Sequence, residues 1–296
     1  MKTNNITATV VQDSYSNGVR ITTLELEYPR FIHAEVLTHR QFSRNSASSR
    51  AVPVDDMLKM VHANPAEPVW WGKTQSGMQA HEEIDDTSVA VTYWNAARYS
   101  ALDYAETLKD LNLHKQIVNR ITEPFQMIRV VLTATEFANF FQLRDHPDAQ
   151  PEIRALAKAM GKAMQESKPM HILPGDWHVP YVTRRQDEAG QVFYGDEITL
   201  DRASARLVSA SCCAQVSYRL ADRSLEKAER IAKRLLKARP WHASPFEHQA
   251  TPMTGVTRTL EIQPGVTHMD THNRLWSANF RAWIQHRQLL EQAEIS

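Results

Sequence analysis

The segment from Thr38 to Arg50, THRQFSRNSASSR, concentrates groups that could hold an anion. Its thirteen residues include three Arg, one His and four Ser. Guanidinium and hydroxyl donors gathered in this way are typical of a phosphate-binding site. The whole chain has 34 basic and 34 acidic residues, so it carries no overall field that would attract a polyanion. Any anion site must therefore be local.

Two other Arg residues lie in segments that could belong to the same site. Arg120 ends HKQIVNR, and Arg144 ends the largely apolar run NFFQLR. A guanidinium group can bind a phosphate through two parallel hydrogen bonds or contact a pyrimidine carbonyl. For a single Arg, a surface or salt-bridged role is the more common alternative. Residue types and spacing alone predict a local anion site and no more.

Composition excludes several classes of protein. The chain is 42% hydrophobic and 23% charged, as in soluble globular proteins. Its first ten residues, MKTNNITATV, lack the apolar core of a signal peptide, and no run is long enough to span a membrane. We therefore expect a cytoplasmic location, with no membrane and no extended nucleic-acid partner. Cys212 and Cys213 are adjacent and lack nearby ligands, so we expect two buried thiols and no metal site.

The hydrophobic pattern predicts an α+β fold with helices packed on a mostly antiparallel sheet. Alternation predicts strands over residues 20–28 and 128–135. Helical spacing is found over residues 30–43, 83–116, 136–166, 201–219, 224–239 and 276–294, with Ser224 as an N-cap. We expect one compact unit in three parts: residues 1–168, a loop-rich connection over 169–200, and residues 201–296.

Three separate blocks resemble the flavin-dependent thymidylate synthases. The family signature, Arg-His-Arg-x-x-Ser followed by Asn-Glu-x-Ser-x-Arg, is matched by His39, Arg40, Ser43, Asn45, Ser48 and Arg50. A second family block is matched by Arg120, Asn139, Leu143 and Arg144. Residues 213–218 (CAQVSY) and 242–248 (HASPFEH) resemble segments that are N-terminal in the family. Because they are C-terminal here, the resemblance is to a circularly permuted member.

A fourth segment, RAWIQHRQLL at residues 281–290, resembles the family run Arg-x-Trp-x-x-His-Arg. Arg281, Trp283, His286 and Arg287 are in step with it. One interpretation is a duplicated strand–helix unit, of which residues 34–42 are the first copy. The other is an amphipathic terminal helix whose packing side carries Trp276, Phe280, Trp283, Ile284 and Leu290. Both stay open at the level of sequence.

The resemblance implies a reaction. Family members transfer a methylene group from methylenetetrahydrofolate to C5 of deoxyuridine monophosphate (dUMP) and reduce it with hydride from FAD, which NADPH reduces. Arg144 would be catalytic, stabilising uracil deprotonated at N3. The nucleotide would be held by Ser48, Ser49, Arg50, Arg120 and Arg144. The flavin would be met by His39, Arg40, Ser46, Asn139, His242 and Ser244. A homo-oligomer, either tetramer or dimer, is also implied.

Several signature positions differ, and most of them face flavin in the family. Thr38 replaces the first Arg, Ser46 replaces the Glu, and Glu35 replaces a Gln. Thr133 and Thr135 replace an Asn and an Arg, and Gln285 or Arg287 could compensate. An alternative is therefore a flavin-independent hydroxymethylase that acts on dUMP or deoxycytidylate and gives a 5-hydroxymethyl pyrimidine nucleotide. A third hypothesis is a nucleotide-binding module without catalysis.

Overall fold

A five-stranded sheet forms the centre of the molecule. The computed structural model describes residues 5–217, 222–254 and 263–295. The strands are β1 (Thr7–Ser16), β2 (Val19–Pro29), β3 (Ser43–Ser46), β4 (Met127–Ala134) and β5 (Met170–His171). Their order is β3-β4-β2-β1-β5, and every pair except β1–β5 is antiparallel. The predicted α+β fold with a mostly antiparallel sheet is therefore confirmed.

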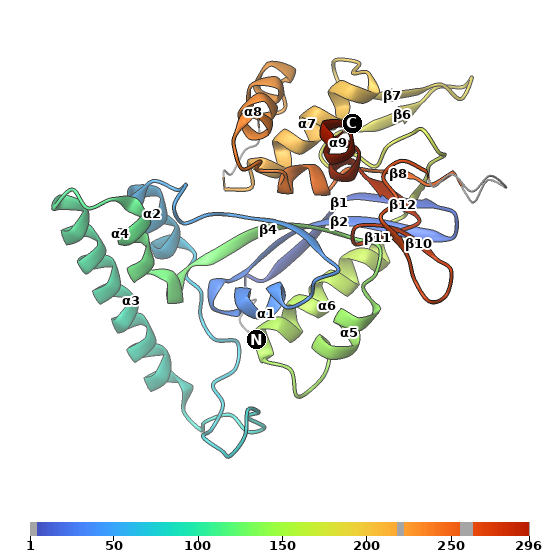
Figure 1. Cartoon of the computed structure of the whole chain (residues 1–296). Coiled ribbons are helices and arrows are strands. Elements are labelled where there is room, and N and C mark those ends of the chain that lie inside the picture. The colour runs from blue at the N-terminus through green and yellow to red at the C-terminus, as the bar shows by residue number, and fades with distance from the viewer. Residues whose placement is uncertain (1–4, 218–221, 255–262, 296) are drawn as a thin grey trace.

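Helices cover one face of this sheet (Figure 1). They are α1 (His33–Leu37), which follows the short helix η1 (Arg30–Ile32), α5 (Ala138–Arg144) and α6 (Pro151–Glu166). Leu24, Leu26 and Leu132 point from the strands into a core shared with Phe140 and Leu156. Because β2 is buried on both faces for much of its length, it holds these helices and the C-terminal elements in fixed positions.

The C-terminal residues cover the opposite face (Figure 1). They form the hairpin β6 (Arg184–Gln186) and β7 (Val192–Tyr194), and the helices α7 (Arg202–Ala214), α8 (Leu225–Lys237) and η3 (Ser244–Glu247). The remaining elements are β8 (Ala250–Pro252), β9 (His268–Met269), β10 (Leu275–Ser277), β11 (Phe280–Arg281), β12 (Trp283–Gln285) and α9 (His286–Ile295). Ser224 caps α8 as predicted, since its side chain accepts a hydrogen bond from the amide of Lys227.

A helical layer stands at one end of the sheet, at the left of Figure 1. It consists of α2 (Val54–Ala63), α3 (Thr87–Asp110) and α4 (Lys115–Ile121), followed by the short helix η2 (Glu123–Phe125). Met57, Leu102 and Val118 pack together within it. No described helix in any part of the fold is long and apolar enough to cross a membrane.

Several predicted elements differ from the structure. The helix expected over residues 30–43 ends at Leu37, because the Ser-, Arg- and Asn-rich stretch that follows pairs with β4 as β3. The terminal helix expected over 276–294 begins only at His286; three strands precede it. Ala278 and Ala282 have positive φ angles, which a continuous right-handed helix does not allow. The amphipathic-helix interpretation of that run is therefore wrong.

Two other helices also differ from their expected limits. The helix expected over 83–116 is divided, with a break before His114. The helix expected over 201–219 ends at Ala214. Residues 218 and 219, which include the last residue of CAQVSY, lie outside the described residues.

Candidate active site

The guanidinium group of Arg144 is held by the end of α1 and the residues after it. Arg144 is the last residue of α5, and its Nε donates to Nε2 of His39 at 2.9 Å. One terminal nitrogen lies 3.4 Å from Oγ1 of Thr38, and the other lies 3.6 Å from the carboxylate of Glu35. Two residues 105 positions apart in sequence, both expected in the site, are thus brought into direct contact.

His39 is a neutral partner for this cation. Its ring is buried and meets the ring of Phe140 edge to face, with 4.9 Å between centroids. Burial lowers the pKa of His39, and the charges of Arg144 and Arg44 lower it further. Since Nε2 accepts the hydrogen bond from Arg144, the proton must lie on Nδ1. His39 can therefore orient Arg144 without adding a competing positive charge.

A cavity of about 610 Å³ opens beside Arg144. This volume is within the usual range for small-molecule sites. Arg144 and Glu35 line one side, and the aromatic rings of Phe31, Trp70 and Trp94 line another. The cavity thus combines a cation, three carboxyl groups (Glu35, Asp148 and Glu152) and flat apolar surfaces that could pack against a planar heteroaromatic ring.

One wall of the cavity is the loop between α2 and α3. The indole nitrogen of Trp70 donates to the carbonyl of Ala80 at 3.1 Å, which closes the loop on itself. A side chain at Gly72 would collide with Cβ of Ala80, so the turn requires glycine. The buried carboxylate of Glu152 accepts from the amide of Val69 at 2.8 Å and anchors the loop to α6. Burial raises the pKa of Glu152.

The expected phosphate-binding residues converge on a carboxylate. Oε1 of Glu123 lies 3.0 Å from a terminal nitrogen of Arg120, 3.2 Å from Nε of Arg30 and 3.5 Å from Oγ of Ser49. The structure therefore brings Ser49 and Arg120 together. Next to Ser49, the side chain of Arg50 is exposed.

The remaining expected residues lie less closely together. Ser48 accepts from the amide of Arg50 at 3.3 Å, and Ser46 pairs with Val130 in the sheet. The carbonyl oxygen of Ser244 lies 3.1 Å from the side-chain amide of Asn45. Three exposed side chains are not hydrogen-bonded to the other expected residues within the described part of the chain: Arg40, Asn139 and His242.

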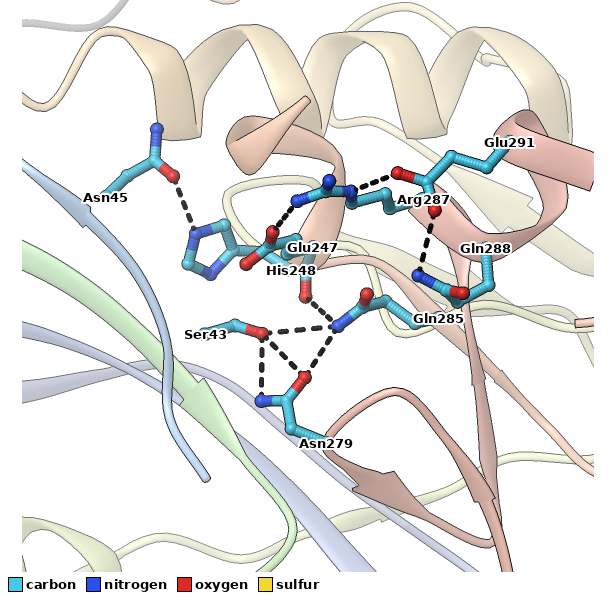
Figure 2. Close-up of polar contacts among 9 residues, drawn as sticks. All are labelled: Ser43, Asn45, Glu247, His248, Asn279, Gln285, Arg287, Gln288 and Glu291. Atoms are coloured by element: carbon cyan, nitrogen blue, oxygen red, sulfur yellow. Dashed lines mark hydrogen bonds and ion pairs between the residues drawn. The ribbon is translucent and has the colours of Figure 1, made fainter. Parts of the chain in front are cut away.

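The structure adds a polar cluster against the signature strand (Figure 2). Nε2 of Gln285 donates to Oγ of Ser43 at 3.2 Å and to Oδ1 of Asn279 at 3.0 Å. Arg287 instead pairs with Glu247 and Glu291. Of the two residues considered as replacements, Gln285 thus reaches the signature strand and Arg287 is engaged elsewhere. Nothing in the sequence pattern pointed to Asn279.

The segments matched at the C-terminus lie beside the signature strand. Nε2 of His248, the last residue of HASPFEH, is 3.3 Å from the side-chain amide of Asn45, 203 residues earlier in the chain. This is the proximity that a circularly permuted order requires. Among the described residues, no group of three or more His, Cys, Asp or Glu could hold a metal ion.

Comparison with known proteins identifies a family for part of the chain. The family described as thymidylate synthase complementing protein (Thy1) matches residues 19–170. No curated protein sequence matches significantly. Among solved structures, the UMP/dUMP methylase PolB from Streptomyces cacaoi bound with 5-Br dUMP is 18% identical, with a TM-score of 0.47 over 55% of this chain and 91% of that one. The same methylase bound with 5-Br UMP gives 16% identity and a TM-score of 0.45 over 55% and 90%.

The family match covers most of the expected site residues; His242 and Ser244 lie outside it. Residues 19–170 run from β2 to β5 and include the signature, Arg120 and Arg144. The match spans about half of the chain. The protein therefore belongs to the thymidylate synthase complementing protein family and is a thymidylate synthase-like one-carbon transferase acting on pyrimidine nucleotides.

Proposed function

We propose that the protein transfers a one-carbon unit from methylenetetrahydrofolate to C5 of dUMP and completes the reaction by flavin-dependent reduction, giving thymidylate. The observation that carries this proposal is the guanidinium of Arg144, fixed by neutral His39 at the edge of a cavity with aromatic walls. A cation at this point can stabilise negative charge on a pyrimidine carbonyl, which raises the electron density at C5.

The contacts of Arg144 favour this role. His39 accepts a hydrogen bond from Nε of Arg144, and Thr38 contacts one of its terminal nitrogens. About one fifth of the Arg144 side chain remains exposed. Because His39 is neutral, it leaves the charge of the guanidinium in place; the carboxylate paired with Arg144 is that of Glu35, at 3.6 Å. Arg144 thus needs little reorganisation when charge develops on the substrate.

The phosphate of the nucleotide would bind at Ser48, Ser49, Arg50 and Arg120. In the structure Glu123 already accepts from Ser49 and Arg120. A phosphate would compete with this carboxylate for the same donors, and the exposed Arg50 supplies a further cation beside them. Glu123 therefore marks where an anion is accepted.

The residues present suit a flavin. Arg40 offers a cation, and Asn139, His242 and Ser244 offer hydrogen-bonding groups; all four side chains are exposed. Buried His39 and part-exposed Ser46 belong to the same signature segment. When bound, FAD supplies the hydride of the final reduction, with NADPH as the reductant. The chain's own contribution would be to hold the ring in place.

A second candidate, a hydroxymethylase, is favoured by the surroundings of Thr38. The hydroxyl of Thr38, which replaces a signature Arg, donates to the carbonyl of Glu35 at 2.7 Å. Thr38 itself is uncharged, and the cations beside it are Arg144, 3.4 Å from its hydroxyl, and Arg44, which donates to the carbonyls of Leu37 and His39. If water instead of hydride completes the reaction, the product is a 5-hydroxymethyl derivative of dUMP or of deoxycytidylate.

Product identity tests both candidates. The protein is incubated with dUMP or deoxycytidylate and labelled methylenetetrahydrofolate, with and without FAD and NADPH, and the nucleotide is analysed by mass spectrometry. Thymidylate formed only with FAD and NADPH supports the synthase. A hydroxymethyl nucleotide formed without flavin supports the second candidate. Nucleotide binding with no product under any condition contradicts both and leaves a binding module.

Arg144→Ala tests the proposed role of the guanidinium. It should abolish exchange of the C5 proton with solvent while dUMP still binds through its phosphate. The matched control is Arg185→Ala, an exposed Arg in the β6–β7 hairpin, which should keep full activity. Full activity of Arg144→Ala would refute the proposed mechanism.

A further inference from the structure

A continuous chain of hydrogen-bonded side chains crosses the interior of the sheet and ends at the signature strand. It connects β1, β2 and β4 with the segment after β5 and with the residue after η3. Its six members are Ser14, His178, Thr23, Thr133, His248 and Asn45. Five of the six are completely buried, and only Asn45 reaches the candidate site. None of the buried five has a role in the proposed reaction.

The first half of the chain is centred on His178. Its Nδ1 lies 2.9 Å from Oγ of Ser14, and its Nε2 lies 2.8 Å from Oγ1 of Thr23. The hydroxyls of Thr23 and Thr133 face each other across β2 and β4 at 2.7 Å. Thr133 then lies 2.8 Å from Nδ1 of His248. Every contact is within ordinary hydrogen-bond distance.

The orientation of Asn45 fixes the direction of the whole chain. The side-chain atom of Asn45 that lies 3.3 Å from Nε2 of His248 is also 3.1 Å from the carbonyl oxygens of Ser244 and Arg44. Two carbonyl acceptors at one point require the amide nitrogen there (Figure 2 draws the other rotation of this amide). Nε2 of His248 is therefore an acceptor, and its proton is on Nδ1.

Once Nε2 of His248 is an acceptor, the donor and the acceptor of each remaining contact follow in turn. Nδ1 of His248 donates to Thr133, so the Thr133 hydroxyl donates to Thr23. The Thr23 hydroxyl then donates to Nε2 of His178, whose Nδ1 donates to Ser14. Both histidines are thus neutral Nδ1–H tautomers. Burial independently favours the neutral form, since it lowers the pKa of His178 and of His248 to about 3.

We propose that His178 and His248 are positioning residues that act together with the carbonyl oxygens of Ser244 and Arg44 to fix the amide of Asn45, so that its oxygen faces away from His248 as an acceptor for a ring imide N–H. Rotating Asn45 by half a turn would set its oxygen against the lone pair of His248. To avoid this, both histidines would have to change tautomer and both threonine hydroxyls would have to reverse. All of these changes would occur without access to water, so the chain opposes the rotation as a unit.

The ligand half of this inference rests on the proposed function. A uracil ring and the isoalloxazine ring of flavin both carry an imide N–H, whereas cytosine does not. A fixed acceptor at Asn45 therefore suits FAD, or dUMP while its ring is still neutral and before the deprotonation proposed at Arg144, whereas deoxycytidylate could donate only from its exocyclic amino group. Separate titrations with dUMP, FAD and deoxycytidylate show which of these ligands the acceptor binds.

Thr133→Val tests the inference, because it removes one hydroxyl from the middle of the chain with little change in shape. Thr22→Val is the matched control: Thr22 is also completely buried in the same sheet, and its hydroxyl donates to Asp13 outside the chain. Both variants should lose some stability. Thr133→Ser keeps a hydroxyl and should behave as the unmodified protein does.

The readouts are nitrogen NMR signals of His248 and Asn45 in the ligand-free protein and the affinities for the three ligands. We expect His248 as the Nδ1–H tautomer and a single ordered amide signal from Asn45. In Thr133→Val that signal should shift and broaden, and the affinity for dUMP or for FAD should fall by about tenfold. Thr22→Val should change neither.

Two results would overturn the inference. One is His248 protonated at Nε2 in the unmodified protein. The other is unchanged affinity for both dUMP and FAD in Thr133→Val. The NMR signals do not depend on turnover, so a protein that makes no product but shows the expected tautomer and the expected loss of affinity contradicts the proposed function alone.

Discussion

Mild acid should destabilise this protein strongly because three histidine rings are buried in the neutral form. His178 and His248 are completely buried, and His286 is nearly so, between the rings of Trp177 and Phe246. Burial lowers the pKa of each of the three to about 3. In the unfolded chain a histidine titrates near pH 6.5, so below about that pH only the unfolded state takes up these protons.

The direction and size of the effect follow from this difference. The stabilisation is complete above about pH 6.5 and is lost as the pH falls towards 3, because protonation favours the unfolded chain. Between about pH 7 and pH 5, each ring lowers the free energy of unfolding by about 2 kcal/mol, or about 6 kcal/mol for the three. The pKa values of His33 and His39 are also lowered, so these residues act in the same direction. A loss of this size approaches the total stability of many domains, about 5–15 kcal/mol.

Urea unfolding followed by tryptophan fluorescence, repeated in small steps between about pH 7 and pH 5, measures this slope. The slope near pH 5.5 should reach the uptake of about three protons on unfolding or more, because His33 and His39 add to the three rings. His286→Leu should reduce it by about one proton, and the exposed control His272→Gln should leave it unchanged. A slope below about one proton in the unmodified protein would show that these rings are protonated in the folded state and would refute the reasoning.

Two further changes test the packing of the C-terminal half. Gly265→Ala should lower the free energy of unfolding by more than about 2 kcal/mol, because φ is +88° and a Cβ would collide with Ile284. The control Gly175→Ala, at φ +92° with open space around it, should lower it by about 1 kcal/mol. Equal losses in urea titrations would contradict this. Arg184→Leu should cost about 3–5 kcal/mol at neutral pH, because it leaves the buried carboxylate of Asp176, now 2.8 Å from Arg184, with only the more exposed Arg202 at 3.1 Å. A loss below about 1 kcal/mol would show that water reaches Asp176.

Local patterns predicted the elements around the candidate site well. The strands expected over residues 20–28 and 128–135 are β2 and β4 with nearly the same limits, because alternating or continuous β-branched residues have few other ways to be buried. Pro151 begins α6, where a missing amide donor costs nothing. These elements position Arg144 and the signature segment.

The other elements depend on long-range strand pairing, which the local sequence pattern does not show. Ser43–Ser46 has no strand pattern of its own and is extended because the edge of β4 is available to it. The aromatic residues at 276–285 have spacing that suits a helix, and only the positive φ angles at Ala278 and Ala282 separate the strands. Such angles are uncommon for alanine and cannot be inferred from its presence.

The sequence predicted those residues of the candidate site that lie in the family motifs. His39 and Arg144 were both expected, and their contact follows from α1 and α5 lying on one face of the sheet. Glu123 was missed because a single Glu carries no spacing signal. His178 was missed because WHVPY resembles none of the family motifs, although the ring of His178 contacts Thr23 in the centre of the sheet.

The C-terminal run RAWIQHR contributes to the site without being a structural copy of the first. Its in-step counterpart contains α1, whereas Trp283–Gln285 forms β12 and His286 begins α9. Gln285 is the in-step equivalent of Thr38, and it reaches the signature strand through Ser43. An uncharged amide thus stands at the in-step position of the first signature Arg, while Arg287 pairs with Glu247 and Glu291. Neither run carries that Arg, and the cations beside Thr38 are Arg44 and Arg144. For this reason the requirement for FAD, more than nucleotide binding, decides between the two candidate reactions.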